Sequence, residues 1–171
     1  FVEFENAFGY EYVYYVGANP NVKYAALVFE GPRTNANGLV FSNINASNIL
    51  LTDLANPTIT DSTFTLGIDA YTLGKRSAID ALGAGAGISD PMRISSSTFT
   101  GDPDGTCGNS PTGINMINVD NSYISIDGVS ITDNGFGVIF KQSSGEIINS
   151  VIDVNCAGVN TNGFKQTGSI K

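Results

Sequence analysis

The feature that most constrains the fold is a repeat near the C-terminal end of the chain. Residues 124–140 read ISIDGVSITDNGFGVIF and residues 145–164 read GEIINSVIDVNCAGVNTNGF. Asn134 and Asn155 occupy the same place in the two units, 21 residues apart, and Gly145 and Gly168 begin two units 23 residues apart. A repeat of this length is typical of a solenoid, in which each unit buries its apolar face against its neighbours.

One spacing rule runs through the repeat and extends toward the N-terminus. A core residue at position i is followed by a small or apolar residue at i+3 and an apolar residue at i+5. The rule is met by Ile59, Ser62 and Phe64; by Ile94, Ser97 and Phe99; by Ile126, Val129 and Ile131; and by Ile147, Ser150 and Ile152. The near-identity of STFT at 62–65 and 97–100 supports this alignment. Ile49, Thr52 and Leu54 also fit, but they lie too close to Ile59 to start a separate turn, so we expect them on another face of the same turn.

The rule places strand starts at 59, 94, 126 and 147, with a fifth at 170. The two longer gaps predict insertions at 67–91 and 101–113. Both insertions follow the same strand of successive turns, so we expect them side by side at one edge. Short β-runs broken by Gly, Asn and Asp complete the pattern of an all-β solenoid.

The stretch ISIDGVSITDNGFGVIFKQSSGEIINSVIDVNCAGV resembles the parallel β-helix repeat of the pectin-lyase-like superfamily. The resemblance covers roughly residues 38–171. It implies a right-handed parallel β-helix of about five rungs and says little about activity, because this fold hosts many functions. We therefore predict two parts, an N-terminal strand and cap segment at 1–38 and the β-helix at 39–171.

The first sixteen residues hold an aromatic strand with period-two alternation. Such a face needs a cover, and two interpretations are open. The strand caps the first turn of the solenoid, or it is donated to a neighbouring subunit. The assembly residues expected here, with the start of a new rung at the other end, are Phe1, Phe4, Phe8, Tyr10, Tyr12, Tyr14 and Ile170.

Three further segments have local predictions. Residues 24–30 read as a buried strand, and residues 31–38, which contain Pro32 and Arg33, read as a polar loop. Residues 73–82 suit a short helix ended by Gly83.

The two cysteines, Cys107 and Cys156, fall at the same corner of the repeat, two rungs apart. A disulfide between them would stabilise by about 4 kcal/mol in the chain-entropy model and would place the protein outside the cytosol. Two buried free thiols are the alternative.

Other site candidates are few. Asp102 and Asp104 sit in DPDGT, which is half of a calcium-loop pattern, so calcium is the one cofactor that the residues suggest; a turn that needs Asp and Gly for backbone reasons explains the same letters. Asn45 begins an N-x-S sequon, a glycan acceptor in a secreted protein. Asn134 and Asn155 are interpreted as structural corner residues.

The resemblance also implies what catalysis would need. Lyases of this superfamily use an Arg or Lys base with calcium held by several Asp, and hydrolases use clustered Asp with a nearby His. This chain has no His. Its candidate carboxylates, Asp61, Asp127, Asp133 and Asp153, fall at different strand offsets, and Lys141 and Lys165 look like a repeated surface pair. We predict no hydrolase activity and at most weak lyase activity.

The net charge and the first residue of the chain limit the partners and the form of the protein that we expect. The net charge is −8 with only eight Lys and Arg, which argues against nucleic acid and anionic membranes, and no apolar run is long enough to span a membrane. The chain starts at Phe1 rather than Met, which predicts a processed mature form or a fragment of a longer β-helix. Two functions are expected: an extracellular or cell-surface structural protein that assembles with itself through its solenoid ends as a filament, sheath or fibre, or a carbohydrate-binding or lyase-like β-helix that uses the insertion edge on a polysaccharide.

Overall fold

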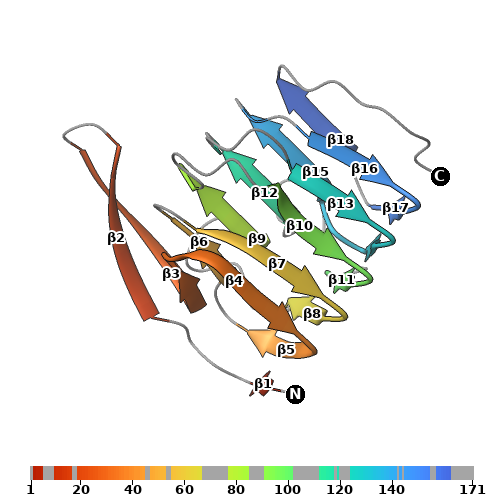
Figure 1. The fold of residues 1–171 in the computed structure, drawn as a ribbon, viewed down its shortest axis with the longest axis horizontal. Helices are drawn as coiled ribbons and strands as arrows, with labels where there is room; N and C mark the ends of the chain where they lie inside the picture. Colours follow the sequence, from red (N-terminus) through yellow and green to blue (C-terminus); the bar gives the residue numbers. More distant parts are fainter. Residues whose placement is uncertain are drawn as a thin grey trace.

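A computed structural model shows that the chain folds into three β-sheets, within each of which strands from successive rungs lie side by side (Figure 1). The structure describes residues 2–5, 10–16, 19–44, 47–52, 55–66, 77–84, 91–101, 112–117, 119, 124–141, 143, 145–154 and 157–162. Within these residues every regular element is a strand. The strands stack along one axis from the N-terminal part to the C-terminal part of the chain (Figure 1).

Each sheet collects one strand from every rung. Sheet A contains, in spatial order, β1 (Val2–Glu5), β5 (Leu39–Ile44), β8 (Thr63–Leu66), β11 (Thr98–Thr100), β14 (Ser130–Thr132) and β17 (Val151–Asp153). Sheet C contains β4 (Pro32–Asn37), β7 (Asn56–Thr60), β10 (Met92–Ser95), β13 (Ile124–Asp127) and β16 (Gly145–Ile148). Sheet B contains β2 (Tyr10–Val16), β3 (Asn19–Phe29), β6 (Ser47–Leu51), β9 (Ser77–Leu82), β12 (Thr112–Ile117), β15 (Phe136–Lys141) and β18 (Ala157–Asn162).

From β3 onward the chain visits sheets B, C and A in strict rotation. The sequence β3–β4–β5 is repeated as β6–β7–β8 and so on to β15–β16–β17, which makes five rungs before β18. All neighbouring strands are parallel except β2, which pairs antiparallel with β3. The predicted all-β parallel β-helix of about five rungs is confirmed.

The spacing rule is the register of two of these sheets. Position i forms one column of sheet C, in which Ile59, Ile94, Ile126 and Ile147 are paired in turn. Position i+5 forms a column of sheet A, in which Phe64, Phe99, Ile131 and Ile152 are paired. Seven of these eight side chains are fully buried and Ile152 is partly exposed. Each buried one contributes about 1.5–3 kcal/mol to stability.

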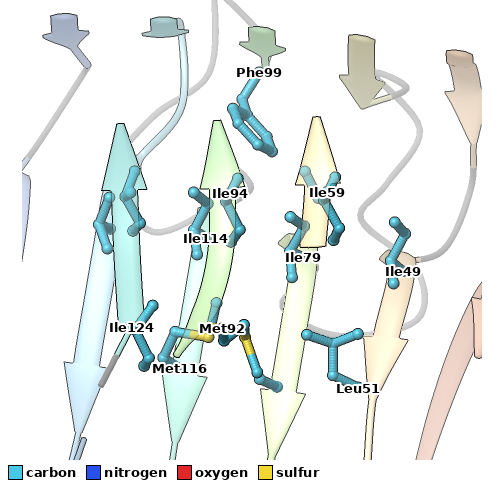
Figure 2. Packing of buried hydrophobic residues seen from close by; sticks show 14 of the residues in the cluster. Ile49, Leu51, Ile59, Ile79, Met92, Ile94, Phe99, Ile114, Met116 and Ile124 are labelled. Carbon is cyan, nitrogen blue, oxygen red and sulfur yellow. The ribbon is translucent and has the colours of Figure 1, made fainter. Parts of the chain in front are cut away.

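Sheet B supplies the third wall of the core. Ile49 pairs with Ile79, and Ile79 with Ile114, so these three isoleucines form a column that faces the columns of the other sheets (Figure 2). Ile49 therefore lies on another face of its rung, as expected. Phe41, Phe64 and Phe99 stack above one another inside the solenoid, with ring centroids 5.2 and 4.7 Å apart.

The corner between sheets C and A explains why positions i and i+5 keep a fixed spacing. The residue at i+2 has a positive φ in each of the five rungs. These residues are Gly38, Asp61, Ser96, Gly128 and Asn149. Gly, Asp and Asn adopt this left-handed conformation more readily than most residues. This left-handed conformation turns the chain within three residues. The strand of sheet A therefore begins at the same distance after the strand of sheet C in each rung.

The serine at i+3 stabilises this corner through hydrogen bonds. The Oγ of Ser97 accepts a hydrogen bond from the backbone N–H of Ser62 at 3.1 Å and donates to the carbonyl of Ser95 at 2.8 Å. Ser62 makes the same pair of bonds to Leu39 and Thr60. A buried hydroxyl thus satisfies backbone groups that the turn would leave without partners.

Two local predictions were wrong. Residues 77–82 of the expected helix form β9, because Ile79 and Ala81 align with the buried residues of β6 and β12 and must join the sheet to cover the core. Residues 32–37 of the expected polar loop form β4, where Ala36 takes the place of Ile59 in its column. The parallel sheets therefore include β3 and β4, which lie within the segment assigned to the N-terminal part.

Candidate functional surfaces

The outward face of sheet A carries a regular array of hydroxyl groups. Strands β8, β11 and β14 read TFT, TFT and SIT, and their central residue is buried in the core. Because side chains alternate along a strand, the flanking residues point outward. The six hydroxyl residues are Thr63, Thr65, Thr98, Thr100, Ser130 and Thr132, and all are partly or fully exposed.

These hydroxyls form two columns in register. Thr98 pairs with Thr63 on one side and Ser130 on the other, and Thr100 pairs with Thr65 and Thr132. Neighbours within a column are about 4.8 Å apart, and the two columns are about 6.6 Å apart, given the usual strand spacing and rise. The array ends at Val151 and Asp153 in β17, which are both exposed.

The core beneath the array is regular. The rings of Phe64 and Phe99, which lie directly beneath it, are 1° from parallel, and those of Phe41 and Phe64 are 11° from parallel. Adjacent strands in ordinary sheets are rotated by about 20–25°. The small angles show that equivalent phenylalanines in successive rungs hold their rings in the same orientation, as expected of rungs with little relative twist.

The outward face of sheet C is different, because it is mixed and charged. One outward column runs Asn35, Thr58, Arg93, Ser125 and Glu146, and the other runs Asn37, Thr60, Ser95, Asp127 and Ile148. Ser125 donates a hydrogen bond to Glu146 at 3.1 Å, and Asn149 donates one to Asp127 at 2.9 Å. At the other end Asn37 donates to Thr60 Oγ1 at 2.7 Å and to Asp61 at 2.8 Å.

Sheet C therefore brings one guanidinium and two carboxylates to a single face. Arg93 neighbours Ser125 across the strand pair, with Asp127 diagonal to it and Glu146 one strand further. A calcium ion usually takes six to eight oxygen ligands. In the described part of the chain no group of three His, Cys, Asp or Glu side chains is placed to hold a metal ion.

The other candidate carboxylates are spread around the solenoid. Asp61 lies at the corner between sheets C and A, Asp133 follows β14, and Asp153 ends β17. Lys141 is exposed at the end of β15. Asp133 and Asp153 are neighbours on successive rungs, where the backbone N–H of Asp133 donates to the carbonyl of Asp153 at 3.1 Å, whereas Asp61 and Lys141 lie elsewhere.

The side chain of Asn134 has a structural role. It is fully buried, and its side-chain amide donates to the carbonyls of Thr132 at 2.7 Å and Phe99 at 3.3 Å. It thereby ties one rung to the preceding one.

Several predicted site residues lie outside the described residues. They are Cys107, Cys156, Asp102, Asp104, Asn45, Asn155, Lys165, Phe1, Phe8 and Ile170. The disulfide, the calcium loop and the glycan acceptor therefore stay predictions. Phe4 lies in β1 opposite Phe41, and Tyr10, Tyr12 and Tyr14 lie in β2, the first strand of sheet B.

The hydroxyl array was missed in the sequence, although its signal was present. The repeated STFT at 62–65 and 97–100 was used only to align the rungs. Two threonines around a buried phenylalanine already place two hydroxyls on the outer face of each strand.

Comparison of the chain with protein-family models, with curated proteins and with solved structures finds no match. The relation to the pectin-lyase-like superfamily therefore stays a prediction. In the ranges that the structure describes, no helix is long and apolar enough to cross a membrane.

Proposed function

We propose that the protein is an extracellular or cell-surface structural β-helix that assembles with itself through its solenoid ends, as the subunit of a filament, sheath or fibre. The observation that supports this proposal is the partial exposure of core residues in the last described strands of the stack. Ile152 and Val159 are partly exposed, whereas their partners one rung earlier, Ile131 and Val138, are fully buried.

The same end also presents strand edges. Within the described part of the chain, β16, β17 and β18 are the last strands of their sheets. A strand edge with unpaired backbone groups is a template for another strand. A second copy that places its first strands on these edges would continue the apolar columns, and a contact between unlike ends that does not close produces a filament.

The extracellular part of the proposal rests on the expected bond between Cys107 and Cys156, because disulfides persist in oxidising compartments. Intact mass before and after alkylation without reductant tests it. Two alkylated thiols would contradict it.

Two adjacent residues of β17 offer a matched test of assembly. Ile152 belongs to the inner column, and Val151 points outward with 51% of its surface exposed. We expect the natural protein and Val151→Lys to form polymers in sedimentation velocity and negative-stain microscopy. We expect Ile152→Lys to remain monomeric with an unchanged circular dichroism spectrum, because a charge would have to be buried in the contact. A natural chain that stays monomeric at high concentration would contradict the proposal.

A carbohydrate-binding or lyase-like function is the second candidate. Its support is the outward face of sheet C, where Arg93 lies near Asp127 and Glu146. An Arg beside carboxylates is the arrangement that a lyase base with calcium would need. Turnover of pectin or alginate in the presence of calcium, lost in Arg93→Ala and kept in Ser95→Ala, would favour this function over a purely structural one.

A further inference from the structure

We propose that the outward face of sheet A binds the surface of ice crystals, through the two in-register columns of hydroxyls on β8, β11 and β14. This inference does not depend on self-assembly, because the array is complete within a single chain. Its ligand is a crystal of water rather than a molecule, so its recognition rests on repeat distances instead of a pocket.

The composition of the array needs an explanation beyond strand propensity. Threonine favours β-strands because it is β-branched, and that preference applies equally to the outward positions of sheet C. Yet in the same three rungs the outward columns of sheet C are interrupted by Arg93 and Asp127 among Thr58, Thr60, Ser95 and Ser125, whereas sheet A repeats Thr or Ser at every outward position. The two faces share the same backbone geometry and the same core. An unbroken and uncharged set of hydroxyls therefore distinguishes sheet A from sheet C.

The spacing of the array suits an ordered lattice. Hydroxyls about 4.8 Å apart along the stack and about 6.6 Å apart along the strands form a rectangular net. These repeats are close to those between water oxygens on the prism face of hexagonal ice. A hydroxyl can donate one hydrogen bond and accept two, so each residue can take the place of a water molecule at the crystal surface.

Flatness and rigidity allow several hydroxyls to bind at once. The stacked rings of Phe64 and Phe99, parallel to 1°, support a regular alignment of the rungs beneath the array. The threonine side chains are held by buried neighbours in the same strands, and χ1 of a β-branched residue is stiff. Little conformational entropy is therefore lost when the face meets a crystal.

The chemistry of the face argues against other occupants. The six outward residues of β8, β11 and β14 are uncharged, and a strongly hydrated ammonium or carboxylate would hold its own water shell against the lattice. Polysaccharide sites commonly use aromatic platforms and convergent polar groups, but the outward side chains of these strands are only Thr and Ser. These six side chains offer neither a charge nor an aromatic ring to a ligand.

The test uses the full chain and two lysine variants of one rung. Thr98→Lys places a long, charged side chain in the centre of the array. Ser95→Lys makes the same kind of change three residues earlier, on the outward face of sheet C beside Asp127. Both positions are at least partly exposed, and circular dichroism checks that both variants keep the fold. The measurements are the fraction of protein taken up by slowly growing ice and the thermal hysteresis gap.

The expected result is uptake into ice and a measurable gap for the natural protein and Ser95→Lys, and loss of both for Thr98→Lys. Exclusion of the natural protein from ice overturns the proposal. Equal losses in the two variants also overturn it, because the effect would then not belong to sheet A. Exclusion from ice combined with co-sedimentation on crystalline cellulose or chitin overturns it as well and assigns the face to a polysaccharide.

Discussion

The stack of three phenylalanines offers the most direct test of how the rungs hold together. Phe64 lies between Phe41 and Phe99, is fully buried, and stacks on both rings at 5.2 and 4.7 Å. Phe64→Ala removes the ring from the centre of this column and leaves a cavity between two aromatic neighbours.

The expected cost can be worked from these contacts. A buried Phe→Ala change costs about 3–5 kcal/mol, and the value rises with the volume of the cavity that remains. Each aromatic pair adds about 0.5–1.5 kcal/mol beyond area burial, and here two pairs are lost. Flanking rings on a fixed β-ladder cannot collapse into the gap. We therefore expect a loss at or above the upper end of the first range, about 5 kcal/mol, which is a large share of the 5–15 kcal/mol typical of a domain.

Urea unfolding followed by circular dichroism measures this loss. Thr63→Ala is the matched control, because Thr63 is the exposed neighbour on the opposite face of β8, and we expect a change within about 0.5 kcal/mol. Phe64→Leu fills most of the space and should cost less than about 1.5 kcal/mol. A loss below 1.5 kcal/mol for Phe64→Ala, on the order of the leucine variant, would refute the idea that the column is a rigid part of the core.

Three further changes test the corners and the core. Ser97→Ala should lower the free energy of unfolding by about 1–3 kcal/mol, because the buried N–H of Ser62 loses its acceptor; denaturant unfolding measures it, and a neutral effect would contradict the role of the corner serine. Ser96→Gly should raise it by about 1 kcal/mol, because φ is +49° at this exposed position; a Ser96→Val variant is expected to lose stability, and equal effects of the two would reject the backbone argument. Asn48→Ala should raise the melting temperature, because this amide is fully buried and neither of its side-chain polar atoms has a hydrogen-bond partner among the residues that the structure describes; a loss of more than 1 kcal/mol, on the order of a lost hydrogen bond, would show that the amide has one.

Two of the three sheets could be predicted from the sequence because their strands are joined by a corner of constant length. A left-handed residue and a buried serine, valine or leucine take the chain from sheet C to sheet A in every rung, so Ile94 and Phe99 keep the spacing of Ile59 and Phe64. Nothing fixes the length between sheet A and sheet B in the same way. The segments after Leu66 and after Thr100 differ in length from those in later rungs, and this variation hid the column of Ile79 and Ile114.

The two local errors have one physical cause. Ala78, Ala81 and their neighbours favour a helix by intrinsic propensity, and Pro32 and the Asn residues of β4 favour a loop. Parallel neighbours, β6 and β12 beside β9 and β7 beside β4, override these preferences, because a gap in the ladder would leave backbone groups unpaired next to a buried core. Propensity in a solenoid is therefore a weaker guide than column position.

The separation of inner and outer columns also explains why a site can be tested here without unfolding the protein. In β11 the fold depends on one buried residue, Phe99, while the two flanking residues contribute little to packing. Selection can therefore change Thr98 and Thr100 freely, and a uniform run of hydroxyls at such free positions indicates a constraint from outside the chain. On the outer face of sheet C the hydroxyls of Thr58, Thr60, Ser95 and Ser125 are interrupted by Arg93 and Asp127. The comparison of Thr98→Lys with Ser95→Lys uses this difference directly, since both changes leave the core columns intact and only one interrupts the array.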